Sequence, residues 1–147
     1  MRILVVSSVG GHLTEVMQLE PLLRGHDVVL VVNDAAELPE FPFTRVYRIA
    51  HAERDWRVLL NFAEAARILT EEEPSVLLSA GAGPVVPFAV LARVMGVRVV
   101  YIESAAAVTR PTLTGRLMYP LADAFFYQWP VLARSFPRGS LVPVVFG

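Results

Sequence analysis

Residues Arg2 to His12 read Arg-Ile-Leu-Val-Val-Ser-Ser-Val-Gly-Gly-His, and this stretch decides the fold. The run Ile3–Val6 is apolar and rich in β-branched residues, which is typical of a buried strand. The adjacent glycines allow a tight turn, and a helix predicted over His12–Leu23 follows directly. A strand, a glycine turn and a helix in this order are typical of a nucleotide- and phosphate-handling α/β domain, because free N–H groups at a helix start attract phosphate.

Short apolar strands alternate with helices along the rest of the chain. This alternation predicts a parallel sheet with right-handed crossovers and helices on both faces. The uninterrupted apolar run Val28–Val32 fits a strand covered on both sides. We therefore expect a single Rossmann-like α/β domain over residues 1–147. The expected strands are Ile3–Val6, Asp27–Val32, Arg45–Ile49, Ser75–Ser79, Val97–Ile102, Ala124–Tyr127 and Leu141–Phe146, and the helices after the first are Asp55–Glu72, Val85–Met95, Thr112–Leu121 and Val131–Ser135.

The composition excludes several classes of function. A net charge of −1 argues against a large nucleic-acid footprint. The chain has no cysteine, and its three histidines lack metal-ligand spacing. Thiolate catalysis is thereby excluded, and we predict neither a metal nor a cofactor. Hydrophobic residues make up 54% of the chain, which favours a sheet buried on both faces, a surface for a partner or membrane, or both.

The helix predicted over Asp55–Glu72 is more apolar than a helix on a sheet requires. Such a helix needs one apolar face, whereas here apolar residues cover most of the surface around a narrow polar stripe. The candidate membrane or partner face consists of Trp56, Leu59, Leu60 and Phe62. The chain shows no signal peptide and no apolar run near ~18 residues, so we expect a cytoplasmic protein lying at the inner face of the cell membrane.

The C-terminal third of the chain is locally basic. Its charged residues after Glu103 are Arg110, Arg116, Asp123, Arg134 and Arg138. Four arginines against one acid suit an anionic ligand or an anionic lipid surface. Arg116 is our candidate for holding a diphosphate, and an ordinary solvated arginine is the alternative.

The loop after the first strand is the first candidate site. Ser8, Gly10 and Gly11 allow close approach of the backbone to a phosphate. His12 opens the helix, where an imidazole can accept a proton or contact a phosphate. We therefore predict a phosphate-binding loop in which His12 is the acid–base group.

Two further loops follow strands expected to end at the same edge of the sheet. Gly81 and Gly83 form a second glycine turn before a helix, which is either a ligand loop or a structural turn. Glu103 and Ser104 end a buried strand, where a carboxylate is costly unless it has a partner. The sequence leaves three roles open for Glu103: orienting His12, accepting a sugar hydroxyl, or capping the next helix.

Several motifs together resemble a known family. They are Ser7-Ser8-Val9-Gly10-Gly11-His12-Leu13-Thr14-Glu15, Gly81-Ala82-Gly83-Pro84, Ile102-Glu103-Ser104, Thr112-Leu113-Thr114-Gly115-Arg116-Leu117, Tyr119-Pro120-Leu121-Ala122-Asp123 and Gln128-Trp129-Pro130. In this order they resemble the bacterial polysaccharide-biosynthesis proteins of the PssD/CpsF type, relatives of the eukaryotic membrane-anchor subunit of the split UDP-N-acetylglucosamine transferase. The resemblance covers essentially the whole chain.

The same loops are similar to the N-terminal half of MurG, a two-domain GT-B glycosyltransferase. The resemblance implies that this chain is the N-terminal, acceptor-binding half, inactive alone, and that a second polypeptide binds the UDP-sugar. The implied reaction is inverting transfer of N-acetylglucosamine or another hexose to a polyprenyl-diphosphate-linked acceptor. By position, Gly10 and Gly11 border the diphosphate, His12 is the general base or positions the acceptor, and Glu103 faces the cleft. We therefore predict His12 and Glu103 as catalytic residues. The other predicted acceptor- or diphosphate-binding residues are Ser8, Gly81, Gly83, Ser104 and Arg116.

Two other functions fit the same residues. One is a non-catalytic scaffold that recruits and activates the donor-binding subunit at the membrane. The other is a stand-alone nucleotide-binding enzyme, for which Asp34 near the end of the second strand would bind a ribose. The strict glycine fingerprint of dinucleotide-binding proteins is absent after the first strand, which disfavours an oxidoreductase.

Overall fold

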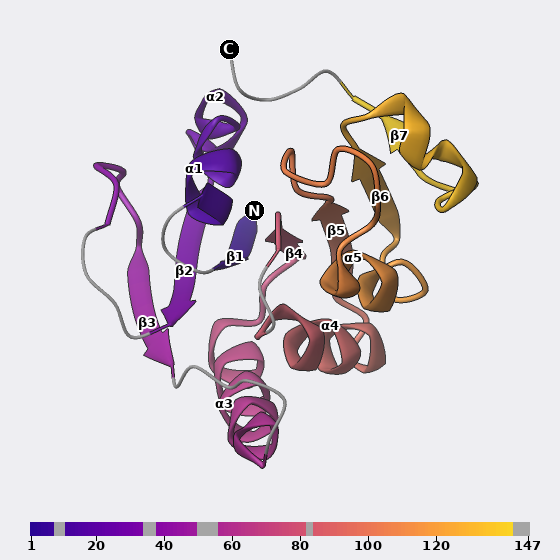
Figure 1. Cartoon of the computed structure of the whole chain (residues 1–147). Coiled ribbons are helices and arrows are strands. Elements are labelled where there is room, and N and C mark those ends of the chain that lie inside the picture. Colours follow the sequence, from indigo (N-terminus) through magenta and orange to yellow (C-terminus); the bar gives the residue numbers. More distant parts are fainter. Residues whose placement is uncertain (8–10, 34–37, 50–55, 82–83, 143–147) are drawn as a thin grey trace.

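The computed structural model contains one parallel sheet with helices on both faces (Figure 1). It describes residues 1–7, 11–33, 38–49, 56–81 and 84–142, with only the backbone of Gly11, His12 and Arg57. The strands are β1 Arg2–Ser7, β2 Asp27–Asn33, β3 Arg45–Ile49, β4 Val76–Ser79, β5 Arg98–Ile102, β6 Ala124–Tyr127 and β7 Ser140–Leu141. The helices are α1 Gly11–Met17, α2 Glu20–Leu23, α3 Arg57–Glu72, α4 Val85–Val94, α5 Leu113–Met118 and the 3₁₀ helix η1 Pro130–Arg134. The predicted Rossmann-like α/β fold is confirmed.

The strand order β3-β2-β1-β4-β5-β6-β7 places β1 and β4 at the centre of the sheet. Alternate residues of β1 point to opposite faces, so Leu4 and Val6 pack with α3, α4 and α5, whereas Ile3 and Val5 pack with α1 and α2. Figure 1 shows α1 and α2 on one side of the sheet and α3 and α4 on the other. The apolar strands are therefore largely explained by burial on two faces.

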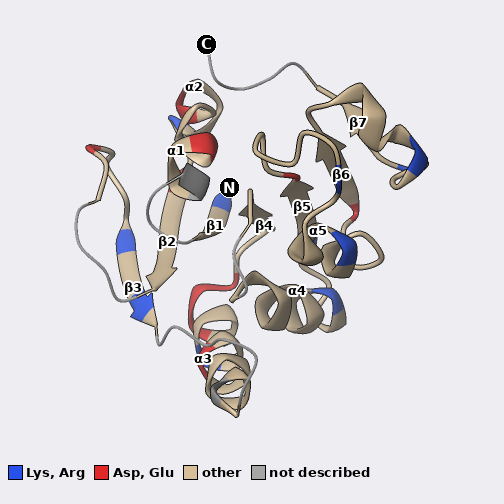
Figure 2. Ribbon diagram, in the orientation of Figure 1, with Lys and Arg blue, Asp and Glu red and all other residues tan. Residues whose placement is uncertain are grey.

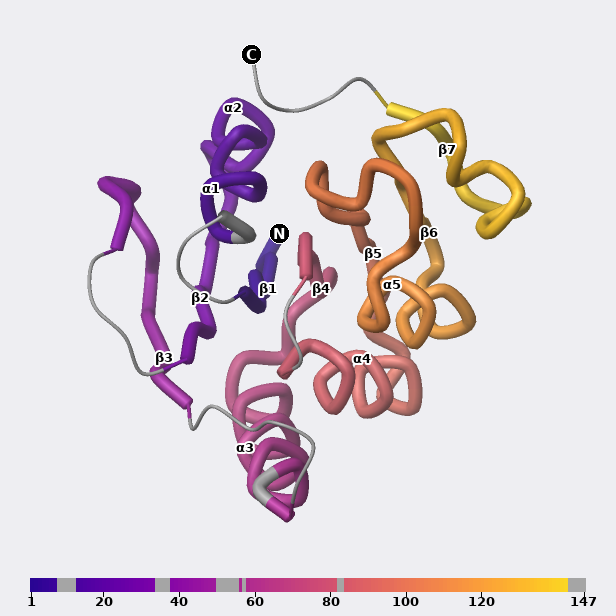
Figure 3. Tube along the Cα trace, in the orientation of Figure 1, coloured from indigo at the N-terminus to yellow at the C-terminus, as the bar shows by residue number. Residues whose placement is uncertain are grey.

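The first helix differs from its prediction, because it is broken. The helix expected over His12–Leu23 divides into α1 and α2, and the chain turns at Gln18 and Leu19 (Figure 3). Pro21 has no N–H to donate to the carbonyl of Met17, and its ring crowds that carbonyl, so a continuous helix cannot pass this point. The last predicted strand also differs: β7 ends at Leu141, and residues 143–147 lie outside the described part of the chain.

A buried carboxylate anchors the C-terminal end of α3 at the amino edge of the sheet. Glu72 accepts hydrogen bonds from Arg45 Nε at 2.6 Å and Tyr47 Oη at 2.7 Å, and it pairs with Arg2 at 3.3 Å. The Arg45 bond, above all, holds the pKa of Glu72 below its usual range, and the bond to Glu72 raises the pKa of Tyr47 to about 12. These contacts fix the C-terminal end of α3 at the amino edge, and the start of the helix lies toward the carboxyl edge.

None of the helices in the described ranges combines the length and the hydrophobicity that crossing a bilayer requires.

Candidate functional site

The carboxyl ends of β1, β4 and β5 lie next to one another at one edge of the sheet, because these three strands are neighbours. The helices α1, α4 and α5 begin at this edge. In open α/β sheets this edge is where ligands bind. The described side chains of the edge are organised around the segment 103–107 that follows β5.

Glu103 is completely buried, with a relative exposure of 0%. Its carboxylate accepts hydrogen bonds from Thr112 Oγ1 at 2.8 Å, Thr112 N at 3.0 Å and Ser104 N at 3.1 Å. Tyr101 Oη also donates to it at 3.3 Å, and burial raises the pKa of this phenol, which keeps its proton available. Of the three roles left open by the sequence, the geometry supports the structural one. Glu103 fixes the start of α5 and is a positioning residue rather than a group facing the cleft.

The start of α5 is built around this carboxylate. Thr112 is the N-cap, and its Oγ1 accepts a hydrogen bond from Gly115 N at 2.9 Å. A Cβ at Gly115 would lie 2.0 Å from Oε2 of Glu103. Glycine is therefore required at 115 by the close approach of Glu103, which explains the Thr-x-x-Gly spacing of this motif.

A second buried carboxylate joins α1 to the segment after β5. Glu15 is 4% exposed, and its Oε1 accepts hydrogen bonds from Ala105 N at 2.7 Å and Ser104 Oγ at 3.3 Å. Position 12 lies three residues before Glu15 in α1, so both positions are on one side of the helix. Glu15 thus fixes the start of α1, which carries His12, relative to the loop after β5.

Two residues that follow β6 donate hydrogen bonds to the backbone of segment 103–107. Gln128 Nε2 donates to the carbonyl of Glu103 at 3.0 Å. Trp129 Nε1 donates to the carbonyl of Ala105 at 2.6 Å. The motif Gln128-Trp129-Pro130 therefore acts by fixing the backbone of the loop after β5.

The other predicted site residues divide between described and undescribed positions. Ser8, Gly10 and Gly83 lie outside the described residues, and the side chain of His12 is not described. Gly11 is the first residue of α1. The remaining three are described: Gly81, Ser104 and Arg116.

Gly81 is buried and has a φ of 136°, a backbone conformation that favours glycine. Its N–H donates to Ser79 Oγ at 3.1 Å, which indicates a structural turn. Ser104 is also buried, and its Oγ accepts a hydrogen bond from Ala106 N at 3.1 Å. Arg116 is exposed on α5, where Figure 2 shows basic residues.

Sequence reasoning missed the roles of Glu15, Thr112, Gln128 and Trp129, although all four lie in the quoted motifs. The signal for Thr112 was local, since a threonine three residues before a helical Gly is a typical N-cap. The signal for Glu15 was its position one helical turn after His12. The partners of Gln128 and Trp129 are 25 and 24 residues away, and no local pattern predicts them.

The start of α3 presents apolar side chains to solvent. Trp56 is 68% exposed, Leu59 71% and Leu60 44%. Phe62, the fourth residue predicted for this face, is partly buried. Asn61, by contrast, is buried and donates to Glu64 Oε1 at 3.2 Å. Exposed apolar side chains such as Trp56 and Leu59 are typical of a surface that contacts a membrane or a partner.

Among the described residues, no three histidine or acidic side chains converge as metal ligands would.

Comparison with known proteins shows the family. The family model described as "Oligosaccharide biosynthesis protein Alg14 like" matches residues 36–145. The UDP-N-acetylglucosamine transferase subunit ALG14 of Mus musculus is 26% identical, over 94% of this chain and 80% of its own length. The same-named subunit of Yarrowia lipolytica is 35% identical, over 55% of this chain and 40% of its own length.

Solved structures share the fold. MurG from Acinetobacter baumannii superposes with a TM-score of 0.78 at 16% identity, over 96% of this chain and 44% of MurG. The UDP-GlcNAc 2-epimerase of Methanocaldococcus jannaschii superposes with a TM-score of 0.74 at 14% identity, over 94% of this chain and 43% of the epimerase. The chain spans less than half the length of these structures. Because the family model matches most of its length, the chain belongs to the Alg14-like family of oligosaccharide biosynthesis proteins.

Proposed function

We propose that this chain is the acceptor-binding, membrane-associating subunit of a two-component inverting glycosyltransferase, of the bacterial PssD/CpsF type, in polysaccharide biosynthesis. The observation that carries the proposal is its membership of a family whose relatives are named UDP-N-acetylglucosamine transferase subunits. The donor is a UDP-sugar, carrying N-acetylglucosamine or another hexose and held by a second polypeptide. The acceptor is a polyprenyl-diphosphate-linked sugar at the inner face of the cell membrane.

In the proposed reaction, His12 accepts the proton of an acceptor hydroxyl. The hydroxyl oxygen attacks the anomeric carbon of the UDP-sugar from the side opposite UDP. The new glycosidic bond forms as the bond to UDP breaks, and UDP leaves with the bonding electron pair, stabilised by groups of the partner. The role of this chain is to hold the acceptor at the carboxyl edge, where Glu15 fixes α1 by accepting hydrogen bonds from Ser104 Oγ and Ala105 N.

The test is sugar transfer from UDP-N-acetylglucosamine, UDP-glucose and UDP-galactose to a polyprenyl-diphosphate-linked sugar. This chain, a candidate donor-binding polypeptide, and their mixture are assayed separately. We expect activity only in the mixture. Activity of this chain alone would contradict the two-component proposal.

A scaffold without a catalytic group is the second candidate function. The burial of Glu103 favours it, because one of the two residues expected to act on the substrate is enclosed by hydrogen bonds. Turnover by the donor-binding polypeptide alone, only enhanced in the mixture, would support the scaffold.

The exposed start of α3 provides the proposed membrane contact. Trp and Leu side chains on a helix insert at the boundary between headgroups and acyl chains. We expect the double substitution Trp56→Ser/Leu59→Glu to lower binding to anionic vesicles by about tenfold, measured by flotation. The control is Leu117→Glu, an exposed leucine of α5 at 47% exposure. Equal loss in both variants would show that negative charge, and not the α3 surface, governs binding.

A further inference from the structure

The loop 104–112, which connects β5 to α5, is closed at its base by one carboxylate (Figure 1). Glu103 accepts hydrogen bonds from Ser104 N at 3.1 Å and from Thr112 N at 3.0 Å, so the two ends of the loop meet on a single buried side chain. Glu15 ties the same loop to α1 through Ala105 N. The path of the loop is therefore fixed by the fold before any ligand binds.

Five successive N–H groups of this loop are already used inside the protein. Those of residues 104–106 donate to side-chain oxygens of Glu103, Glu15 and Ser104, in that order. The next two donate to carbonyls within the loop. The side chains at 105–108 are alanine, alanine, alanine and valine, which carry no polar atom. Residues 105–108 therefore have no donor left for a phosphate or a sugar oxygen.

The exposed side chains of the loop are apolar first and basic last. Ala106 is exposed, and Val108 is 47% exposed. Thr109 and Arg110 follow, both exposed. In the described part of the chain, no acidic side chain pairs with Arg110. Apolar side chains close in sequence to an unneutralised cation suit a ligand in which an apolar chain is attached to an anion.

The loop lies at the edge of the sheet where the proposed function places the acceptor. Its contact with Glu15 at 2.7 Å holds it against α1, one helical turn from position 12. A diphosphate bound beside the start of α1 would carry its isoprene units away over a neighbouring surface. The loop 104–112 is such a surface, and its exposed side chains at 106 and 108 are apolar.

We propose that Ala106 and Val108 bind the isoprene units next to the diphosphate of the acceptor lipid, with Arg110 facing the diphosphate. This inference rests on the proposed function, which supplies a polyprenyl-diphosphate-linked acceptor. The loop recognises the lipid and not the sugar, because orienting a sugar ring requires the polar groups that residues 105–108 lack. Its fixed path also lowers the entropic cost of holding a flexible chain.

The test uses two exposed valines in a chain without cysteine. Val108 is 47% exposed, and Val131 of η1 is 56% exposed. Val108→Cys and Val131→Cys are made separately, and the rate of maleimide modification is measured for each. The additions are farnesyl diphosphate, inorganic diphosphate, N-acetylglucosamine 1-phosphate, the candidate donor-binding polypeptide, and vesicles without prenyl lipid. We expect saturating farnesyl diphosphate to slow modification at position 108 by about tenfold and to leave position 131 unchanged.

Each other occupant gives a distinct result that overturns the proposal. Protection of position 108 by N-acetylglucosamine 1-phosphate assigns the loop to the acceptor sugar. Protection by the donor-binding polypeptide, without protection by farnesyl diphosphate, makes the loop a contact between subunits. Protection by vesicles without prenyl lipid assigns it to the bilayer surface. Equal protection of positions 108 and 131 by farnesyl diphosphate shows unspecific adsorption, and an unprotected thiol in every mixture also refutes the lipid contact.

Recognition of the lipid is measured in parallel by turnover of the two-component enzyme. Val108→Asp places a charge against the chain, and Val131→Asp is the control. The acceptors carry the same sugar diphosphate on a polyprenyl chain or on a methyl group. We expect Val108→Asp to lower kcat/KM by about tenfold for the polyprenyl acceptor, since the charge would have to be desolvated, and to leave the methyl acceptor unaffected. Equal loss with both acceptors would contradict a lipid contact.

The two proposals fail separately, because maleimide modification requires no sugar transfer. A chain that is protected at position 108 by farnesyl diphosphate but transfers no sugar with any partner would contradict the proposed function and leave the lipid contact standing. A complex that transfers sugar while position 108 stays unprotected would refute the lipid contact alone.

Discussion

The substitution Gly115→Ala should destabilise the protein by about 3 kcal/mol, the upper range for forcing atoms into a packed interior. Helix propensity alone predicts the opposite change in stability, since alanine stabilises a helix by up to about 1 kcal/mol relative to glycine. The clash decides the sign because a Cβ at 115 would lie 2.0 Å from Oε2 of Glu103. That carboxylate cannot retreat without losing its bonds to Thr112 and Ser104.

The measurement is the free energy of unfolding by urea, with Leu117→Ala as a control on the exposed side of the same helix. The control should change stability by less than about 1 kcal/mol. Glu103→Ala removes the clashing group but leaves the hydrogen-bond donors of Thr112 and Ser104 unpaired. Each unpaired buried donor lowers the free energy of unfolding by about 1–3 kcal/mol. The double variant should then be more stable than the sum of the single effects predicts, by about 1–3 kcal/mol. A stabilised Gly115→Ala would show that Glu103 is not held where the structure places it.

The strands were the most predictable part of the fold. Arg45–Ile49 and Ala124–Tyr127 were predicted to the residue, because apolar runs between turn residues are a local signal. The helix over His12–Leu23 was predicted too long, because the pattern of its apolar residues outweighed Pro21. Local periodicity thus locates elements well and misses a break that a single residue imposes.

The edge of the sheet that carries the candidate site could be predicted from the sequence, but the contacts of its side chains could not. The order of strands and glycine turns located the carboxyl edge correctly, since it depends on topology alone. The role of Glu103 depends on Thr112, nine residues away, and that of Glu15 on Ala105, ninety residues away. Contacts between such distant residues exist only after packing, so the sequence left the role of Glu103 open and gave none to Glu15.

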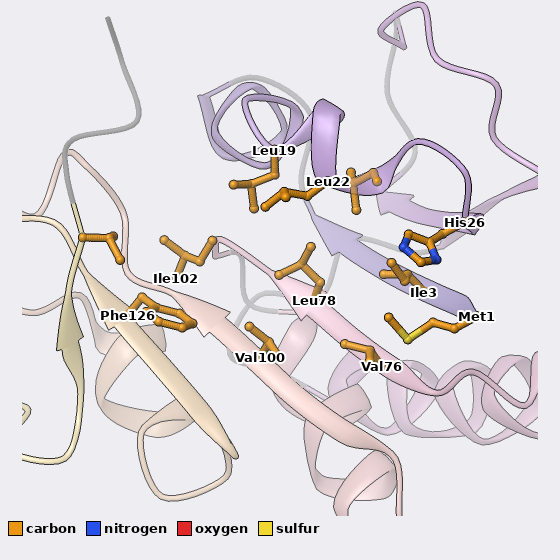
Figure 4. A pocket seen from close by; sticks show the side chains of 12 residues that line it. Met1, Ile3, Leu19, Leu22, His26, Val76, Leu78, Val100, Ile102 and Phe126 are labelled. Carbon is orange, nitrogen blue, oxygen red and sulfur yellow. The ribbon is translucent and has the colours of Figure 1, made fainter.

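An apolar groove on one face of the sheet is lined by side chains of β1, β4, β5 and β6 (Figure 4). The composition indicated an apolar surface of this kind but not its position. A hydrophobic content of 54% indicated either a doubly covered sheet or an apolar surface. The structure contains both: β1 and β2 are covered on two faces, while the groove and the start of α3 remain open to solvent.

Replacing His12 with alanine should lower turnover of the two-component enzyme by about 10²-fold or more, the usual effect of removing a general base. Binding of the donor-binding polypeptide should be unchanged, because the proposed role of His12 is proton transfer and not assembly of the complex. The control is Gln18→Ala, an exposed residue just after α1, which should leave turnover intact. Turnover is measured as transfer of radiolabelled sugar at saturating donor.

The pH profile separates a proton acceptor from a residue that only shapes the loop. A histidine acting as a base must be neutral, so transfer by the unmodified complex should fall toward acidic pH, where imidazole side chains take up a proton. His12→Ala should lose this acidic limb and retain a flat, low rate. Glu15→Gln, which keeps an acceptor oxygen for Ala105 N, should instead keep the limb and raise the KM for the acceptor. If His12→Ala turns over at the original rate, proton transfer belongs to the partner, and this chain acts as the scaffold that brings it to the acceptor.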